Sequence, residues 1–199
     1  MNKKIAVFGG SFSPPHLGHA AVIEGLLRMG KFDEVWVMPS ADRRDKKIST
    51  PGLNRLEMCR LMIKELFSDS PTPILLSDEE LNMPQLTTTH GTNQLLKGKY
   101  ADHDFYFVIG ADLVKDIKKF WVDGEKLWEE ANLIIAKGPC ANLPEELPPH
   151  SIVMNDFGWL SISSTYVRNL VAGGYSGLPY LTKSVASYIQ KNDLYKIKS

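Results

Sequence analysis

The stretch IAVFGGSFSPPHLGH, residues 5–19, decides the fold of this chain. Its first four residues form an apolar run typical of a short buried strand, and residues 18–29 (GHAAVIEGLLRM) carry apolar side chains at helical spacing. The loop between them therefore joins a strand to a helix, which is where α/β proteins bind ligands. Gly9 and Gly10 lack a Cβ atom, so the loop can turn sharply and approach a ligand closely.

Two histidines give this loop its chemical character. His16 and His19 stand at the predicted start of the helix, where free amides and the positive end of the helix dipole attract anions. Two histidines can also bind a metal, but HxxH alone is a weak zinc signal, and no Cys, Asp or Glu nearby completes a tetrahedral set. The chain has neither a GxxxxGK[ST] nor a GxGxxG run. We interpret the segment as a nucleotide-binding loop whose histidines contact phosphate.

The rest of the chain alternates between short apolar runs and amphipathic segments. The predicted strands are 5–8, 34–38, 74–77, 105–109, 133–136 and 151–153. The predicted helices are 18–29, 53–67, 89–96, 112–117, 125–130, 163–172 and 183–190. Strands that alternate with helices form a parallel sheet with helices on both faces. We expect a single Rossmann-like α/β domain over residues 1–199, with the C-terminal helices from about 163 to 195 packed on it.

Composition limits the partners of this protein. The chain has 199 residues, 43% of them hydrophobic, and no net charge at pH 7, so it can bury one core and has no general attraction to nucleic acids or membranes. A local basic cluster follows the second predicted strand and is compatible with an anion-binding loop. Its cations are Arg43, Arg44, Lys46 and Lys47.

No membrane or metal-site signal is present in the sequence. No apolar run approaches the roughly 18 residues of a membrane-spanning helix, and the start MNKKIAVFGG passes directly into a strand. We therefore expect a cytoplasmic protein. Cys59 and Cys140 have no metal-like spacing, and Cys59 lies in an apolar-periodic helix, where a buried thiol is expected.

Three further segments carry candidate binding residues. In FVIGAD, Gly110 permits close backbone approach, and Asp112 can accept hydrogen bonds from ribose hydroxyls or cap a helix. In SISSTYVR, a serine can cap the helix, while Arg168 stands near a helix N-terminus that disfavours a cation unless it meets an anion or an acidic neighbour. In KKFWVDG, Trp121 can pack in the core or stack on a heterocycle.

The GGSFSPPHLGH loop resembles the (H/T)xGH signature of the nucleotidylyltransferase superfamily. Over nearly its whole length, the chain resembles the bacterial nicotinate mononucleotide adenylyltransferases. The other segments that carry the resemblance are TTTHGT (87–92), FVIGAD (107–112), Trp121, ANLIIAKGP (131–139), ISSTYVR (162–168) and VASYIQKNDLY (185–195).

The resemblance implies transfer of AMP from ATP to nicotinate mononucleotide, which yields deamido-NAD and pyrophosphate in NAD biosynthesis. It implies catalytic roles for His16, His19 and Arg168. Implied ATP contacts are Gly9, Gly10, Ser11, Phe12, Gly18, Gly110, Asp112, Ile162, Ser163, Ser164 and Thr165. Implied mononucleotide contacts are Ser13, Lys46, Arg55, Thr89 and Trp121. Mg²⁺ is expected on the substrate phosphates, with no protein ligand.

Several positions depart from the family pattern. Ser13 and Thr88 stand where the family usually has Asp and Tyr, and residues 43–46 (RRDK) replace a PPHK-like run. Two alternatives therefore stay open. One is a related nucleotidylyltransferase with another acceptor, such as nicotinamide mononucleotide or phosphopantetheine, and the other is a catalytically weak nucleotide sensor. In each case the expected partners are small nucleotides. If the protein forms a homo-oligomer, a further copy of the chain is also a partner.

Overall fold

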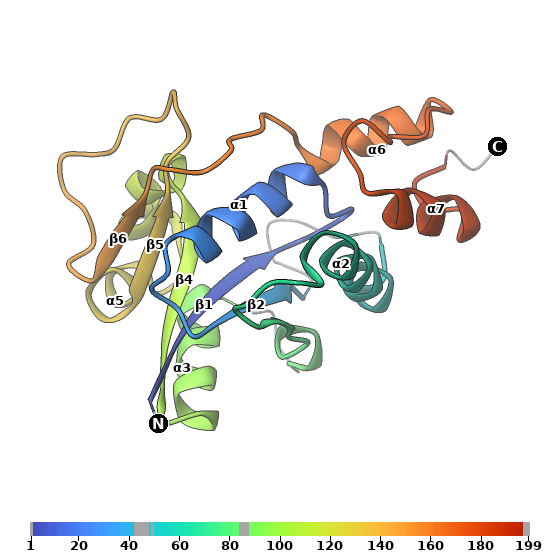
Figure 1. Cartoon of the computed structure of the whole chain (residues 1–199). Helices are drawn as coiled ribbons and strands as arrows, with labels where there is room; N and C mark the ends of the chain where they lie inside the picture. Colours follow the sequence, from blue (N-terminus) through green and yellow to red (C-terminus); the bar gives the residue numbers. More distant parts are fainter. Residues whose placement is uncertain (1, 42–47, 49, 84–87, 197–199) are drawn as a thin grey trace.

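The computed structural model describes residues 2–41, 48, 50–83 and 88–196. These residues form a six-stranded sheet in the order β3-β2-β1-β4-β5-β6 (Figure 1). Each neighbouring pair of strands is parallel, which confirms the expected Rossmann-like α/β fold. The strands are β1 (Lys3–Gly10), β2 (Glu34–Pro39), β3 (Ile74–Leu76), β4 (His103–Gly110), β5 (Asn132–Ala136) and β6 (Ser151–Met154).

Helices connect these strands. The α-helices in the described residues are α1 (Leu17–Arg28), α2 (Gly52–Phe67), α3 (Thr89–Lys99), α4 (Ile117–Phe120), α5 (Gly124–Glu130), α6 (Ser164–Ala172) and α7 (Lys183–Lys191). The 3₁₀ helices are η1 (Glu80–Asn82) and η2 (Ala111–Asp116). Most predicted elements are confirmed, with ends shifted by up to three residues. Within the described ranges, no helix combines the length and apolar composition needed to span a bilayer.

The predicted helix over 112–117 is wrong in type. The segment is the 3₁₀ helix η2, which passes into the four-residue helix α4 at Ile117. Ala111, Val114 and Ile117 are all buried, and their spacing of three residues matches a 3₁₀ turn better than an α-helix. The short helices η1 and α4 were not predicted, because neither is long enough to show a helical period.

The sheet is covered on both faces, which explains the continuous apolar run in β1. Val7 packs in a cluster with Leu96 of α3, Ile117 of α4 and Leu127 of α5. Ala6, its neighbour in sequence, points to the other face and packs with α1. A strand buried on both faces needs apolar residues at successive positions rather than at alternate ones.

The C-terminal helices extend the second layer. Val167 of α6 and Val185 of α7 join a cluster with Met58 of α2. Figure 1 shows α6 and α7 beside α1 and α2, at one side of the sheet. Glu65 of α2 accepts hydrogen bonds from the backbone N–H groups of Lys183 and Ser184 at 3.1 and 2.9 Å, which satisfies free amides at the start of α7. The pKa of Glu65 is lowered, chiefly by a hydrogen bond from the Ser184 side chain and further by these two backbone bonds.

The two central strands, β1 and β4, end at the same edge of the sheet. β1 runs two residues farther than predicted, so Gly9 and Gly10 pair with Met38 and Pro39 of β2. β4 ends at Gly110. The β1–α1 loop and η2 therefore leave the sheet side by side, at the edge where open parallel sheets bind ligands.

Candidate active site

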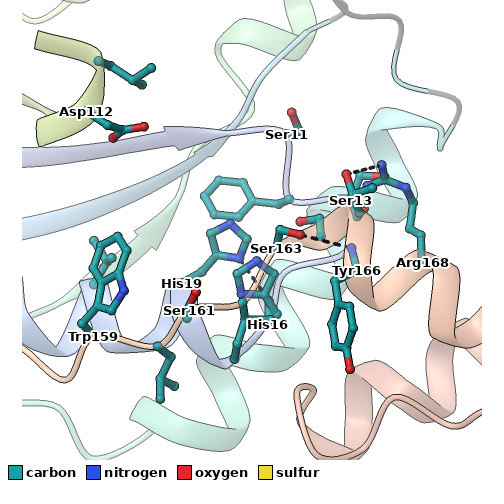
Figure 2. A pocket seen from close by; sticks show the side chains of 18 of the residues that line it. Ser11, Ser13, His16, His19, Asp112, Trp159, Ser161, Ser163, Tyr166 and Arg168 are labelled. Carbon is teal, nitrogen blue, oxygen red and sulfur yellow. Dashed lines mark hydrogen bonds between the residues drawn. The ribbon is translucent and has the colours of Figure 1, made fainter. Parts of the chain in front are cut away.

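A cavity of about 860 Å³ opens at this edge of the sheet. It lies between the β1–α1 loop, the start of η2 and the segment that leads into α6 (Figure 2). The predicted site residues that line it are Ser11, Phe12, Ser13, His16, Gly18, His19, Asp112, Ile162, Ser163, Ser164, Thr165 and Arg168. The structure thus brings together most of the residues that were predicted to contact ATP.

Some predicted site residues are not part of the cavity wall. Gly9, Gly10, Gly110, Arg55, Thr89 and Trp121 are absent from the residues that line it. The three glycines lie at the carboxyl ends of β1 and β4. Lys46, together with the rest of residues 42–47, lies outside the described residues, so the predicted basic loop stays a prediction.

The two histidines form a stacked pair at the start of α1. His16 is the N-cap residue with an extended backbone, and His19 lies one turn farther on. Their ring centroids are 3.7 Å apart and the rings are tilted by 30°. The backbone N–H of His16 donates to Nδ1 of His19 at 3.1 Å. Because the accepting nitrogen carries no proton, this bond assigns the proton of neutral His19 to Nε2.

Burial keeps both rings neutral at pH 7 in the surroundings that the protein itself supplies. His16 is 5% exposed, and burial lowers its pKa to about 4. Burial, followed by the proximity of His16, lowers the pKa of His19 well below its ordinary value. A phosphate group beside the rings would act in the opposite direction, because an adjacent anion favours the imidazolium form. Nδ1 of His16 is buried and has no hydrogen-bond partner among the described residues.

Phe12 holds the histidine pair against the strand. Its backbone is left-handed, with a φ of 45°, although its side chain is 1% exposed. The ring packs edge-on against Phe8 at 5.3 Å and lies 4.9 Å from the ring of His19. A left-handed conformation at a non-glycine residue costs about 1–3 kcal/mol, which burial of the aromatic ring offsets. A Cβ atom at Gly10 would lie 3.3 Å from the Phe12 ring, so Gly10 makes room for it.

Helix α6 fastens the loop from one side. Arg168 donates from Nη1 to the carbonyl oxygen of Ser13 at 2.7 Å and from Nη2 to Oγ1 of Thr165 at 3.0 Å. Ser164 donates to the carbonyl oxygen of Pro14 at 2.9 Å. Ser163 caps the helix, since its Oγ accepts from the N–H of Tyr166 at 3.1 Å. The described partners of Arg168 are thus a carbonyl and a hydroxyl rather than an acidic side chain.

Helix α2 fastens the loop from the other side. Arg55 is 2% exposed and donates from Nη1 to the carbonyl oxygen of Ser11 at 2.9 Å and from Nε to that of Thr50 at 3.1 Å. Arg55 also lines a second, smaller cavity of about 400 Å³ with Leu53 and Leu81. Its described contacts therefore stabilise the loop.

A hydroxyl cluster ties the loop to the C-terminal segment. Oγ of Ser13 donates to Oγ1 of Thr50 at 3.1 Å and lies 3.2 Å from the hydroxyl of Tyr195. Burial raises the pKa of Tyr195, so its hydroxyl stays protonated. Tyr195 is not among the predicted site residues, although its segment VASYIQKNDLY carries part of the family resemblance. Only the tertiary structure brings that segment to residue 13.

Asp112 lies across the cavity from the histidines. It follows β4 directly, within η2, and the N-cap residue of η2 is Gly110, so Asp112 is not a cap. A Cβ atom at Gly110 would lie 2.5 Å from Oδ1 of Asp112, which means that the carboxylate folds back over the glycine. A glycine is therefore needed at residue 110 to leave room for this carboxylate, in addition to the close backbone approach predicted for it.

Thr89 and Trp121 belong to a separate region beside the core. Thr89 is the first residue of α3, capped by Thr88, whose Oγ1 accepts from the N–H of Gly91 at 3.0 Å. Trp121 is half-buried and packs against the cluster on that face of the sheet. His90 lies 3.9 Å from Asp123, so the start of α3 and the turn after Trp121 are side by side. Trp121 thus packs partly against the core, and stacking on a ligand stays a prediction.

The cavity also contains aromatic residues that the sequence analysis missed. Phe157 and Trp159, from the segment between β6 and α6, line it together with Tyr166. This segment has no hydrophobic period, so no sequence pattern identified these side chains.

Comparisons with known proteins agree with this geometry. A family model described as cytidylyltransferase-like matches residues 7–170. The probable nicotinate-nucleotide adenylyltransferase of Bacillus licheniformis is 31% identical over 198 residues, which cover 98% of this chain and 99% of that protein. The nicotinate-nucleotide adenylyltransferase of Bacillus subtilis is 29% identical over 196 residues, with 98% and 99% covered.

Solved structures give the same result. The structure of Plasmodium falciparum nicotinic acid mononucleotide adenylyltransferase complexed with NaAD has a TM-score of 0.83 and 27% identity, with 98% of each chain covered. A putative nicotinate-nucleotide adenylyltransferase from Vibrio parahaemolyticus has a TM-score of 0.69 and 26% identity, with 96% of this chain and 99% of that chain covered.

Proposed function

The chain belongs to the cytidylyltransferase-like family and, within it, to the nicotinate-nucleotide adenylyltransferases, and from this premise we propose that it transfers AMP from ATP to nicotinate mononucleotide. The products are deamido-NAD and pyrophosphate, in NAD biosynthesis. The observation that carries the proposal is the stacked pair of His16 and His19 at the start of α1, on the wall of a nucleotide-sized cavity.

The reaction needs no protein nucleophile. A phosphate oxygen of the mononucleotide forms a bond to the α-phosphorus of ATP, and the bond from that phosphorus to the bridging oxygen breaks as pyrophosphate leaves. The attacking group is already an anion. The protein therefore has to align two substrates and neutralise charge on the transition state.

His16 and His19 would act on the ATP phosphates. The hydrogen bond from the His16 backbone to Nδ1 of His19 leaves the Nε2–H of His19 as the donor for a phosphate oxygen. When phosphate raises the pKa of the buried His16 ring, whose Nδ1 has no described partner, that ring can become a cation next to developing negative charge, while His19 donates from Nε2–H as a neutral ring. Arg168, which lines the same cavity, adds a permanent positive charge.

The remaining ATP contacts follow the cavity wall. Amides and hydroxyls at the start of α6 suit the phosphates, since helix N-termini bind anions. Asp112 suits the ribose hydroxyls, because a carboxylate accepts hydrogen bonds. The proposed ATP-binding residues are Gly9, Gly10, Ser11, Phe12, Gly18, Gly110, Asp112, Ile162, Ser163, Ser164 and Thr165.

The mononucleotide would bind toward the start of α3. We assign its pyridine ring to Trp121 and its carboxylate to Thr89, next to the free amides at the start of α3. Ser13 and Lys46 would lie toward its phosphate. The buried hydrogen bonds of Arg55 favour an indirect role, in which it fixes the loop next to the mononucleotide.

Mg²⁺ would enter with ATP. Among the described residues, no group of three His, Cys, Asp or Glu side chains could hold a metal ion, and Asp112 is the one carboxylate on the cavity wall. This donor set suits a hard ion that keeps several waters and binds mainly to substrate phosphates. When bound, the ion would neutralise charge on those phosphates. A cytoplasmic location and a homo-oligomeric state stay predictions from the sequence.

Pyrophosphate release by the purified protein tests the proposal. The reaction contains ATP and Mg²⁺, with nicotinate mononucleotide, nicotinamide mononucleotide or phosphopantetheine as the acceptor. We expect the highest kcat/KM with nicotinate mononucleotide. Turnover with phosphopantetheine alone would replace the proposed acceptor. Tight binding of ATP without turnover for any acceptor would favour a nucleotide sensor.

A further inference from the structure

One wall of the ATP cavity consists of apolar side chains that lie outside the sequence motifs of the family. We propose that Trp159 is a specificity-determining residue, whose indole is the platform on which the purine base of ATP stacks. The proposal rests on the proposed function, which makes ATP the donor. It adds a choice of base, because a broad indole face favours a purine over a pyrimidine.

One face of the Trp159 ring lies flat on the backbone of Gly138. A Cβ atom at Gly138, just after β5, would lie 2.8, 2.9 and 2.9 Å from Cδ2, Cε2 and Cε3 of Trp159. These three atoms belong to the six-membered ring, and their nearly equal distances show that the face of the ring, not its edge, covers the glycine. A side chain at residue 138 would push the indole away.

The ring is also supported at its edge. Phe157 meets Trp159 in a T-shaped contact, with ring centroids 5.8 Å apart and an angle of 69°. Phe157 in turn packs on α1, where a Cβ atom at Gly25 would lie 2.6 Å from its Cβ. Gly138 therefore makes room for the indole, and Gly25 makes room for Phe157, which supports its edge. These contacts preorganise the indole for stacking.

The other face of the indole is available to a ligand. Trp159 lines the cavity and is 47% exposed, although its neighbours hold it in place. Leu113 and Leu160, both partly exposed, line the cavity as well. Apolar surface of this kind on a cavity wall is typical of a ligand site, since an aromatic ring gains most from burial against another flat ring.

The order of side chains along the cavity matches the order of groups in ATP. Figure 2 shows Trp159 and Asp112 on one side of the histidine pair, and Ser13 and Arg168 on the other. A nucleotide with its phosphates at the histidines and its ribose at Asp112 would therefore have its base at Trp159. The polar end and the apolar end of the cavity suit the two ends of one nucleoside triphosphate.

Equilibrium binding tests the platform independently of turnover. We would measure dissociation constants for ATP, GTP and CTP, each with Mg²⁺, by titration calorimetry on the full chain and on Trp159→Ala and Trp159→Phe. Trp159→Ala should weaken ATP and GTP binding about 5- to 150-fold, the range that base–aromatic stacking gives on alanine substitution. CTP should lose less, and Trp159→Phe should retain most of the ATP affinity.

Two further variants separate stacking from folding. Gly138→Ala keeps Trp159 but displaces its ring, so it should weaken ATP binding in the same direction. Tyr175→Ala removes another aromatic side chain, 69% exposed and absent from the cavity wall, and should bind ATP normally. In steady-state assays, Trp159→Ala should raise the KM for ATP more than it lowers kcat. The reason is that stacking on the base stabilises bound ATP and the transition state equally.

The outcomes are distinct. Unchanged ATP affinity in both Trp159→Ala and Gly138→Ala, or an equal loss for ATP and CTP, would overturn the platform, even if the native chain makes deamido-NAD at a normal rate. Conversely, a purine-selective loss of binding in a chain that releases no pyrophosphate with any acceptor would support the platform and overturn the proposed function.

Discussion

The backbone N–H of His16 is hydrogen-bonded to Nδ1 of His19 at 3.1 Å, and the two rings stack with their centroids 3.7 Å apart. One nitrogen of His19 therefore serves the fold, while the other, Nε2, is left for chemistry. Substitutions that mimic one nitrogen at a time can separate these two tasks.

His19→Asn should keep the fold and lose the reaction. The Asn side-chain oxygen can replace Nδ1 as acceptor, but no group replaces Nε2–H, so kcat should fall about 10²- to 10³-fold, as when one transition-state donor is removed. The melting temperature should change little. Pyrophosphate-release kinetics and thermal unfolding check this, with His19→Gln, which mimics Nε2, as the matched variant. Full activity of His19→Asn would contradict the assigned role.

Stability should fall as the pH is lowered from about 6.5 to about 4. His16 has a folded-state pKa of about 4, below the value near 6.5 of an unfolded chain. At low pH the unfolded state therefore binds a proton that the folded state resists. The full contribution of His16 to the free energy of unfolding is present above pH 6.5, and about 3 kcal/mol of it is lost near pH 4.

Urea unfolding at pH 7 and at pH 4.5 measures this effect. Other groups also titrate in this range, so the informative quantity is the difference between the native chain and His16→Asn, which has no imidazole at this position. The variant should lose less stability on acidification. Equal pH dependence of the two proteins would show that the fold does not keep His16 neutral.

Arg55 and Arg168 should differ in what they stabilise. Arg55→Ala leaves the buried carbonyls of Ser11 and Thr50 without their donor and should cost about 2–4 kcal/mol of unfolding free energy. Arg55→Lys should recover only part, because an ammonium cannot reproduce the guanidinium fork. Arg168→Ala, at a half-buried position, should cost less stability and more kcat. Urea unfolding combined with kinetics checks both, and the reverse pattern would contradict the assignment.

Two glycine substitutions should have opposite consequences. A Cβ atom at Gly18 would lie 3.0 Å from the His16 ring, so Gly18→Ala should displace that ring and lower kcat. At Gly98 a Cβ atom would meet nothing within 4 Å, so Gly98→Ala in α3 should raise stability by about 0.5–1 kcal/mol and leave activity unchanged. Thermal unfolding and pyrophosphate release measured on both variants decide, and normal activity of Gly18→Ala would contradict the close fit.

The sequence predicted the sheet well, and it placed both histidines at the start of the first helix, where the structure has them. The apolar run in β1 is continuous because the strand is buried on both faces, and the GGSFSPPHLGH loop follows it in the chain. His16, His19 and the helix start that carries them are neighbours in sequence, so their proximity required no tertiary information. Arg168 was found for a similar reason, since it lies one turn beyond a recognisable cap.

Contacts between distant segments explain what the sequence analysis missed. Trp159 is held by Gly138, and Tyr195 meets Ser13, but neither pair has a local pattern that predicts it. Arg55 was predicted as a substrate contact from the family resemblance, and that role stays a prediction, but its place relative to the loop depends on how α2 packs. Its two bonds to backbone carbonyls are visible only in the folded chain.

The same long-range contacts have a consequence for synthesis on the ribosome. The N–H of Leu17 donates to the carbonyl oxygen of Tyr180 at 2.9 Å, and Ser13 lies 3.2 Å from Tyr195. The loop emerges well before these partners, which are translated more than 160 residues later. A nascent chain can therefore form much of its sheet while its nucleotide loop is still incompletely held, and the loop gains its last partners only when residue 195 has left the exit tunnel.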